Sequence, residues 1–319
     1  MYASQNMIDE LRMCLWYAVA PTITCKDGNA KVKTKPKHKK HKTNAPEPKS
    51  RKLRLLALHG YSSDAKRFRA KMGAVRSHLK GIASLEFLDA PHCVPPCAHS
   101  RSQLLEPGRG WWCPVDARGK AVTRKQLQAE WHQSVAAVAH KLHECARDGV
   151  PIDGLLAFSQ GGAVALAATA VARNTALAAG AAPTASASAA PRFCVLFSGF
   201  DPSPSMSGTQ TAASSAVTLL PPTYMSGVGL DTGLHSISDS GGVNGLSGLA
   251  TLHCWGSADA IVPPQHSRAL YEMCVAATGA TASTFEHSGG HVVPSAVRGQ
   301  VKAFVAEQAQ AILHCTHHD

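Results

Sequence analysis

The chain has 319 residues, 45% of them hydrophobic, which fits one large α/β domain or two small ones. Its net charge is +11, but most of this charge belongs to the segment 31–52 and not to the rest of the chain. No apolar run reaches the roughly 18 residues of a membrane-spanning helix, and Asp9 and Glu10 stand where a signal peptide carries positive charge, so neither feature is predicted.

The first 52 residues have the composition of an arm and a linker. Residues 1–24 predict a short helix or a poorly ordered arm. Residues 31–52 hold nine lysines, one arginine and one glutamate, with Val32 as the one large aliphatic side chain, so disorder is predicted. This segment is either a solvated linker or a nuclear-localisation or nucleic-acid-binding patch. We therefore expect an arm and Lys-rich linker at 1–52, a folded domain at 53–319, and contact with nucleic acid only through the basic segment.

The ten cysteines are scattered, and no two have Cys-x-x-Cys spacing. Several lie inside apolar runs, such as Cys194 in "FCVLF", where a free cysteine behaves as a small buried side chain. Without a signal peptide we expect free thiols in a reducing compartment, cytoplasmic or, through the basic segment, nuclear. The cluster "HCVPPCAHS" lacks the second ligand pair of a structural zinc site, so no metal ion and no cofactor is predicted.

The folded domain begins with two predicted strands. The apolar runs 53–60 and 84–91 end at glycine or proline and predict buried strands. Between them, helical spacing of apolar residues predicts a helix over 64–81, with Asp64 as N-cap.

A long excursion over the sheet is predicted next, at 92–122, which is rich in proline and glycine. It carries Trp111 and Trp112, which either line an acyl pocket or pack the excursion onto the sheet. The clearest helix follows at 123–149, with a polar start and a glycine stop.

The second half of the chain continues the alternation of strands and helices. Strands are predicted at 152–158, 192–200, 249–256 and 282–287, and helices at 160–174, 264–279 and 295–313. Two segments without periodicity predict flexible insertions, at 175–190 and 201–248. This alternation predicts an α/β fold, with a mostly parallel, doubly wound sheet and helices on both faces.

A serine, an acid and a histidine follow three of the predicted strands. Ser159, Asp259 and His291 come in the chain order of an α/β-hydrolase triad. A serine hydroxyl needs an imidazole to accept its proton, and the imidazole needs a carboxylate to fix its tautomer. In an open parallel sheet the carboxyl ends of the strands meet at one edge, where such a site belongs.

The serine lies in a variant of the G-x-S-x-G elbow, a sharp strand-to-helix turn that lifts the nucleophile above the sheet. The pattern here runs from Ala157 to Gly161, so alanine replaces the first glycine. One extra methyl strains such a turn without excluding it. Two other histidines follow strands: His287 is the rival base, and His59 is interpreted as a loop-lining residue.

From residue 53 to about 310 the chain resembles the FSH family of serine hydrolases, an α/β-hydrolase group. The resemblance rests on "LALHGYSSDAKRF", "FLDAPH", "RGWW", "DGLLAFSQGGAVA", "VLFSGF", "HCWGSADAIVP" and "FEHSGGHVVP". It implies Ser159 as nucleophile, Asp259 as triad acid and His291 as base. It also implies an oxyanion hole made by the backbone N–H groups of Tyr61 and Gln160.

These features predict a hydrolase that cleaves small-molecule carboxylic esters through an acyl-enzyme. "FSQGGA" is also similar to the acyl-protein thioesterase and phospholipase-carboxylesterase group, which is one alternative. A basic-arm interaction protein with an inactive hydrolase fold is another. The acyl and alcohol specificity and the oligomeric state are not indicated by the sequence.

Overall fold

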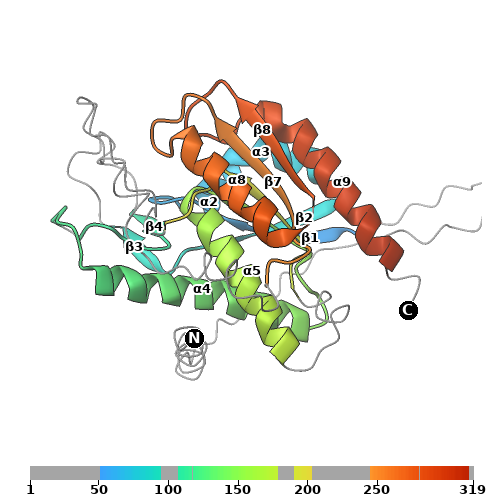
Figure 1. Cartoon of the computed structure of the whole chain (residues 1–319), viewed down its shortest axis with the longest axis horizontal. Coiled ribbons are helices and arrows are strands. Elements are labelled where there is room, and N and C mark those ends of the chain that lie inside the picture. The colour runs from blue at the N-terminus through green and yellow to red at the C-terminus, as the bar shows by residue number, and fades with distance from the viewer. Residues whose placement is uncertain are drawn as a thin grey trace, which may run out of the picture.

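The computed structural model describes residues 51–94, 107–116, 118–178, 190–202, 245–279 and 281–315. Six parallel strands form the central sheet in the order β2-β1-β5-β6-β7-β8 (Figure 1). The strands are β1 (Leu53–Leu58), β2 (Ala83–Leu88), β5 (Gly154–Phe158), β6 (Phe193–Phe197), β7 (Ala250–Gly256) and β8 (Ala282–His287). The predicted parallel α/β-hydrolase sheet is confirmed.

The two middle strands of the sheet, β5 and β6, are apolar along their whole length because helices cover both faces of the sheet. All residues of β5 and β6 are buried. In β1 the side chains alternate between two cores: Leu56 and Leu58 join one, and Leu55 and Ala57 join the other.

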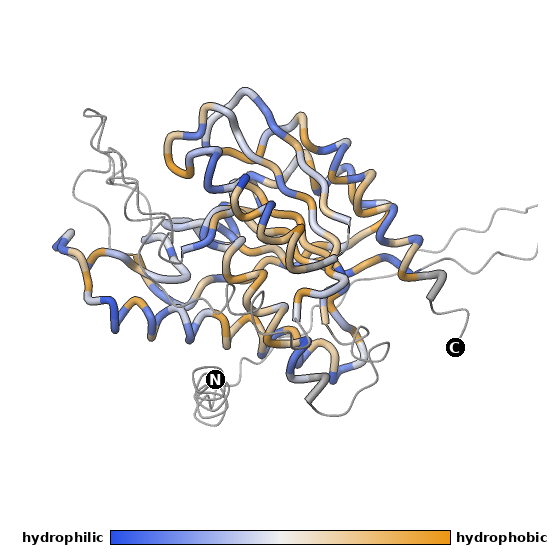
Figure 2. Tube along the Cα trace, in the orientation of Figure 1, coloured by the Kyte–Doolittle hydropathy of each residue, from blue (hydrophilic) through white to orange (hydrophobic). Residues whose placement is uncertain are grey.

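In the part of the chain that the structure describes, three α-helices pack on each face of the sheet. Helices α4 (Arg124–Arg147), α5 (Gln160–Ala178) and α8 (Pro264–Thr278) contribute to one core, and α2 (Ala65–Lys71), α3 (Gly73–Leu79) and α9 (Arg298–Cys315) to the other (Figure 1). Figure 2 shows hydrophilic and hydrophobic residues alternating along α9, as expected of a helix with one face against the sheet.

The helix predicted at 64–81 is wrong as a single element. It is broken at Met72, whose ψ of 7° ends α2 and whose N–H donates to the carbonyls of Phe68 and Ala70. Asp64 does cap α2, since its carboxylate accepts the N–H of Arg67 at 2.6 Å. The helix predicted at 295–313 begins instead with a 3₁₀ turn, η2 (Ser295–Val297), before α9.

The predicted excursion contains an antiparallel ribbon that was not predicted. Strands β3 (His92–Val94) and β4 (Gly108–Gly110) pair with each other, and an isolated bridge joins Arg109 to Ser63. Trp111 and Trp112 are fully buried, and Trp112 packs edge-on against Trp131. The tryptophan pair therefore packs the excursion onto the sheet.

The two predicted insertions are ordered at their ends. Helix α5 continues to Ala178, and Leu246 is fully buried. The rest of both insertions, the arm at 1–24 and the basic segment as far as residue 50 lie outside the described residues, as do Cys97 and His99 of the cysteine cluster.

The described part of the chain begins with a contact to the domain. The Arg51 guanidinium donates to both carboxylate oxygens of the buried Asp153, at 2.8 and 2.6 Å. Among the helices that the structure describes, none combines the length and the apolarity needed to cross a membrane.

Candidate active site

Ser159 stands between the last residue of β5 and the first residue of α5. Its φ is 55°, a conformation that serine rarely adopts, and 1% of its surface is exposed. The turn is held because the Ser159 N–H donates to the Phe197 carbonyl at 2.8 Å, while the Ser159 carbonyl accepts the Gly162 N–H at 2.8 Å. This is the sharp strand-to-helix elbow predicted from the sequence.

The two small residues that flank the serine play different parts. A Cβ added at Gly161 would lie 2.7 Å from the carbonyl oxygens of Leu58 and His59, so glycine lets the start of α5 approach the end of β1. Ala157 lies within β5, fully buried and paired with Leu58 and Leu196, and it is not among the residues with positive φ. Its extra methyl is accommodated in the core.

Asp259 and His291 are in direct contact. His291 Nδ1 lies 2.8 Å from Asp259 Oδ2, and the Asp259 side chain is fully buried. The other carboxylate oxygen, Oδ1, accepts the backbone N–H groups of Ile261 and Val262 at 3.0 and 2.9 Å. A fourth donor is the Ser198 hydroxyl, 2.9 Å from Oδ2, which was not predicted from the sequence.

The surroundings keep Asp259 ionised. Burial acts to raise the pKa of Asp259, but the hydrogen bond and the charge of His291, with the Val262 N–H and the Ser198 hydroxyl, outweigh it and hold the pKa below its usual value. An anionic carboxylate on Nδ1 selects the imidazole tautomer with its proton there, which leaves Nε2 free to accept a proton.

Phe158 contacts the histidine and directly precedes the serine in the chain. Its ring centroid is 4.6 Å from that of His291. The Ser159 hydroxyl makes no hydrogen bond in the structure described, although the atom is buried. Asp259 and His291 therefore meet directly, whereas Ser159 is linked to His291 through its neighbour in the chain, Phe158.

The two rival histidines make other contacts. The His287 ring accepts the Gly289 N–H at 3.1 Å through Nδ1. His59 Nε2 accepts the Ala90 N–H at 3.0 Å, so its Nδ1 carries the proton and donates to the Gly60 carbonyl at 2.7 Å. Burial lowers the pKa of both histidines. Among the three, His291 is the one hydrogen-bonded to Asp259.

Gln160 has a second role that was not predicted from the sequence. As the first residue of α5 its backbone N–H has no acceptor within the helix, the property expected of an oxyanion donor. Its side chain in addition accepts the Trp111 N–H at 3.1 Å and donates to the Trp112 carbonyl at 3.0 Å. It thus ties the excursion to the start of the serine's helix.

Tyr61 follows the end of β1, on the turn that begins with His59 and Gly60. The His59 carbonyl of that turn accepts the Trp111 indole N–H at 2.7 Å. The excursion therefore fixes both chain segments from which an oxyanion hole would be built.

Three deeply buried thiols, those of Cys194, Cys254 and Cys274, are poor candidates for a nucleophile. Burial raises the pKa of Cys194 and Cys274 to about 12, and that of Cys254 further still, so these cysteines remain protonated and poorly reactive. The described residues also contain no group of three or more histidine, cysteine or acidic side chains that could hold a metal ion.

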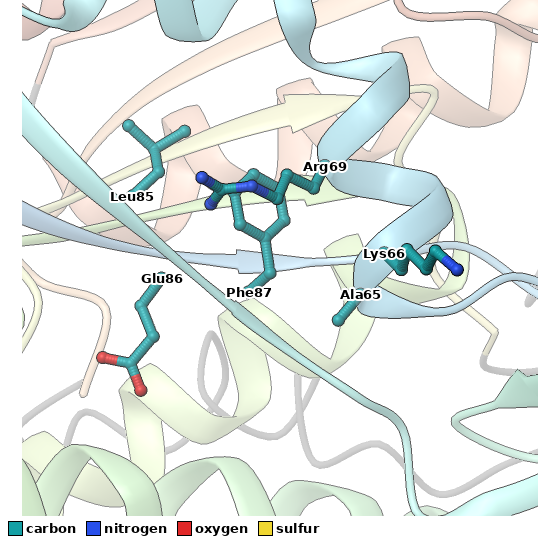
Figure 3. Close-up of a pocket in the computed structure, with 6 residues that line it drawn as sticks. All are labelled: Ala65, Lys66, Arg69, Leu85, Glu86 and Phe87. Carbon is teal, nitrogen blue, oxygen red and sulfur yellow. The ribbon is translucent and has the colours of Figure 1, made fainter. Parts of the chain in front are cut away.

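A surface hollow at the outer edge of the sheet lies apart from these residues (Figure 3). It is formed by residues of α2 and β2: Ala65, Lys66, Arg69, Leu85, Glu86 and Phe87. The Arg69 guanidinium lies over the Phe87 ring, 5.6 Å from its centroid. None of these residues contributes to the contacts around Ser159, so the hollow is not part of the candidate site.

Comparison with known proteins gives matches over most of the chain. The family described as serine hydrolase (FSH1) matches residues 49–303. Esterase OVCA2 of Bos taurus is 30% identical over 254 residues, covering 76% of this chain and 90% of the relative. Esterase CG5412 of Drosophila melanogaster is 29% identical over 255 residues, covering 80% of this chain and 72% of the relative.

Solved structures of low sequence identity share the fold. Esterase PE8 has a TM-score of 0.51 and 17% identity, covering 81% of this chain and 93% of its own. A variant of SOBER1 from Arabidopsis thaliana has a TM-score of 0.50 and 14% identity, covering 81% of this chain and 99% of its own.

Proposed function

Because the chain belongs to the serine hydrolase (FSH1) family, we propose that it cleaves carboxylic esters through an acyl-enzyme on Ser159, with His291 as base and Asp259 as its acid. The observation that carries this proposal is the 2.8 Å contact between His291 and a buried, ionised Asp259, beside a serine held in an elbow. The enzyme is a hydrolase whose named relatives are esterases.

The reaction uses each side chain at a defined atom. Ser159 Oγ attacks the ester carbonyl carbon while its proton passes to His291 Nε2. The carbon–oxygen bond to the alcohol then breaks, and the imidazolium gives its proton to the departing oxygen. Water repeats the sequence on the acyl-enzyme and releases the acid, with Asp259 stabilising the imidazolium in both halves.

The negative charge on the carbonyl oxygen requires donors that are already in place. We assign this part to the backbone N–H groups of Tyr61 and Gln160, which follow the ends of β1 and β5. The support for this assignment is their position beside the serine and the excursion that fixes both segments.

A fluorophosphonate probe tests the nucleophile. The wild-type protein should be labelled and Ser159→Ala should not, while Ser77→Ala, on the exposed face of α3, should be labelled like the wild type. Asp259→Asn and His291→Ala should each lower kcat by about a thousandfold or more. Equal labelling of the wild type and Ser159→Ala would overturn the proposal.

A substrate panel tests the bond that is cleaved. p-Nitrophenyl esters of increasing chain length should be hydrolysed, and the preferred length defines the acyl specificity. Turnover of palmitoylated peptides with no turnover of oxygen esters would instead assign the enzyme to the thioesterases, with the same acyl-enzyme chemistry.

A further inference from the structure

Three residues other than glycine have a positive φ in the described part of the chain, and all three are serines. They are Ser62 at 53°, Ser159 at 55° and Ser198 at 45°. Each follows a strand at the carboxyl edge of the sheet: β1, β5 and β6, respectively. Backbone strain of this kind persists where neighbouring structure enforces it, and it gathers at functional sites.

Ser198 contributes a side chain to the Asp259–His291 pair. Its hydroxyl lies 2.9 Å from Asp259 Oδ2, the same oxygen that contacts His291 Nδ1 at 2.8 Å. Ser198 is 1% exposed and the Asp259 side chain is fully buried, so water does not compete for this bond. With two backbone N–H groups on Oδ1, both carboxylate oxygens have two donors each.

The backbone around Ser198 is fixed from two sides. Its N–H donates to the Cys254 carbonyl of β7 at 2.7 Å, and the carbonyl of Gly199 accepts the Ser267 hydroxyl of α8 at 2.7 Å. Glycine would adopt a φ of 45° with less strain than serine. What serine adds at this position is its hydroxyl, which the fixed turn directs at Asp259.

We propose that Ser198 is a positioning residue, whose hydroxyl orients the Asp259 carboxylate toward His291 and shares the negative charge of Oδ2. This inference rests on the triad proposed above. Without the hydroxyl, Oδ2 keeps one donor instead of two, so the carboxylate is held less firmly in line with the His291 Nδ1–H bond. It also carries more charge toward the imidazole, which favours the protonated ring and keeps the base inactive up to a higher pH.

Other titratable groups lie near the Asp259–His291 pair, and the Ser198 substitutions leave all of them in place. His287, at the end of β8, interacts electrostatically with Asp259 and with Glu286. Lys71 of α2 lies 5.9 Å from the centroid of the Phe158 ring, against which His291 packs. Because substitution of Ser198 alters none of these groups, a shift in the pH profile reports on the Asp259–His291 bond.

The test compares Ser198→Ala and Ser198→Gly with the wild type. Both variants lose the hydroxyl, but glycine also relieves the backbone strain. We expect both to lower kcat by about tenfold with KM within about twofold, since the lost hydrogen bond is to a charged group. The acidic limb of the kcat/KM profile should move to higher pH in both. Ser267→Ala is the control, because it removes a buried hydroxyl of α8 that bonds to the same turn, at the Gly199 carbonyl, and has no hydrogen bond to Asp259.

A double substitution separates this inference from the proposed triad. In an Asp259→Asn background, adding Ser198→Ala should cause no further loss of activity, because the carboxylate that it serves is gone. An unshifted pH profile in both Ser198 variants, or the same shift in Ser267→Ala, would overturn the role of Ser198. Full activity of Asp259→Asn would instead overturn the triad.

Discussion

Ser159 combines a positive φ with a buried side chain, and its neighbours maintain both. Left-handed backbone costs a residue with a Cβ about 1–2 kcal/mol. Hydrogen bonds from the elbow to Phe197 and Gly162 offset this cost. Because the strain is confined to the serine, the residue two places earlier is free to be alanine. The departure of Ala157 from the glycine pattern therefore does not distort the backbone at Ser159.

Substitution of Ala157 by glycine should lower stability and leave catalysis unchanged. The variant loses a fully buried methyl group and gains backbone freedom in a central strand. Together these changes should reduce the free energy of unfolding by about 1–2 kcal/mol. Urea unfolding and p-nitrophenyl ester kinetics check both parts. A large gain in kcat would show that the methyl group does strain the elbow.

The loops that carry the acid and the base are hydrogen-bonded to each other. After β7, the Ser257 N–H donates to the His287 carbonyl at 2.7 Å, and the Ala258 N–H donates to the Gly289 carbonyl at 3.2 Å. Gly256, at the end of β7, makes this approach possible. A Cβ added there would lie 2.1 Å from the Gly289 oxygen, well inside van der Waals contact.

A methyl group at Gly256 should therefore separate acid from base. We expect Gly256→Ala to lower kcat/KM by at least about tenfold, because displacement of catalytic groups by about 1 Å can cost a hundredfold. Gly290→Ala is a matched control in the same pair of loops, since its Cβ would meet the Ala258 oxygen at an ordinary 3.5 Å. Equal kinetics for the two variants would contradict this account.

At the level of elements, the centre of the sheet could be predicted because β5 and β6 are uninterrupted apolar runs. The strand predicted at 282–287 has the bounds of β8, and that predicted at 249–256 differs from β7 by one residue. The triad candidates could be found because parallel strands bring their carboxyl ends to one edge.

The features that were missed depend on contacts between distant residues. Ser198 lies in a segment predicted as strand throughout, and its φ is set by its partners in β7 and at Asp259. The ribbon of β3 and β4 has strands of three residues each, too short to show periodicity. The break at Met72 is an exception that arises locally, and it was missed because apolar spacing continues across it.

At the scale of the whole molecule, the fold buries a titratable side chain of a sheet strand, that of His253. His253 of β7 is 2% exposed, packs edge-on against Tyr271 at 5.5 Å between ring centroids, and has no hydrogen-bond partner at Nε2 in the structure described. Burial lowers its pKa to about 3. The folded protein therefore holds this histidine neutral where the unfolded chain would protonate it.

The free energy of unfolding should consequently decrease as the pH is lowered below about 6.5, the ordinary pKa of histidine. Between that pH and about 3 the unfolded state binds one more proton at His253 than the folded state, so acid favours unfolding. The loss from this residue should be about 2 kcal/mol at pH 5 relative to pH 7.5.

Urea unfolding of the wild type and of His253→Leu at both pH values measures this loss. The variant should lose less stability on acidification than the wild type, although other buried histidines such as His59 still contribute. An identical pH dependence in the two proteins would show that His253 does not limit acid stability.

The ribbon of β3 and β4 also has a consequence for how such an enzyme can diversify. The two strands hold Val94 and Gly108 opposite each other, and Ser63 and Gln160 anchor the chain that follows. Replacing the intervening segment, 95–107, by segments of other lengths tests whether both anchors persist. For a flexible connection, doubling the length costs only about 0.6 kcal/mol in closure entropy. A library of grafts between these two strands therefore tests whether this part of the chain sets substrate preference.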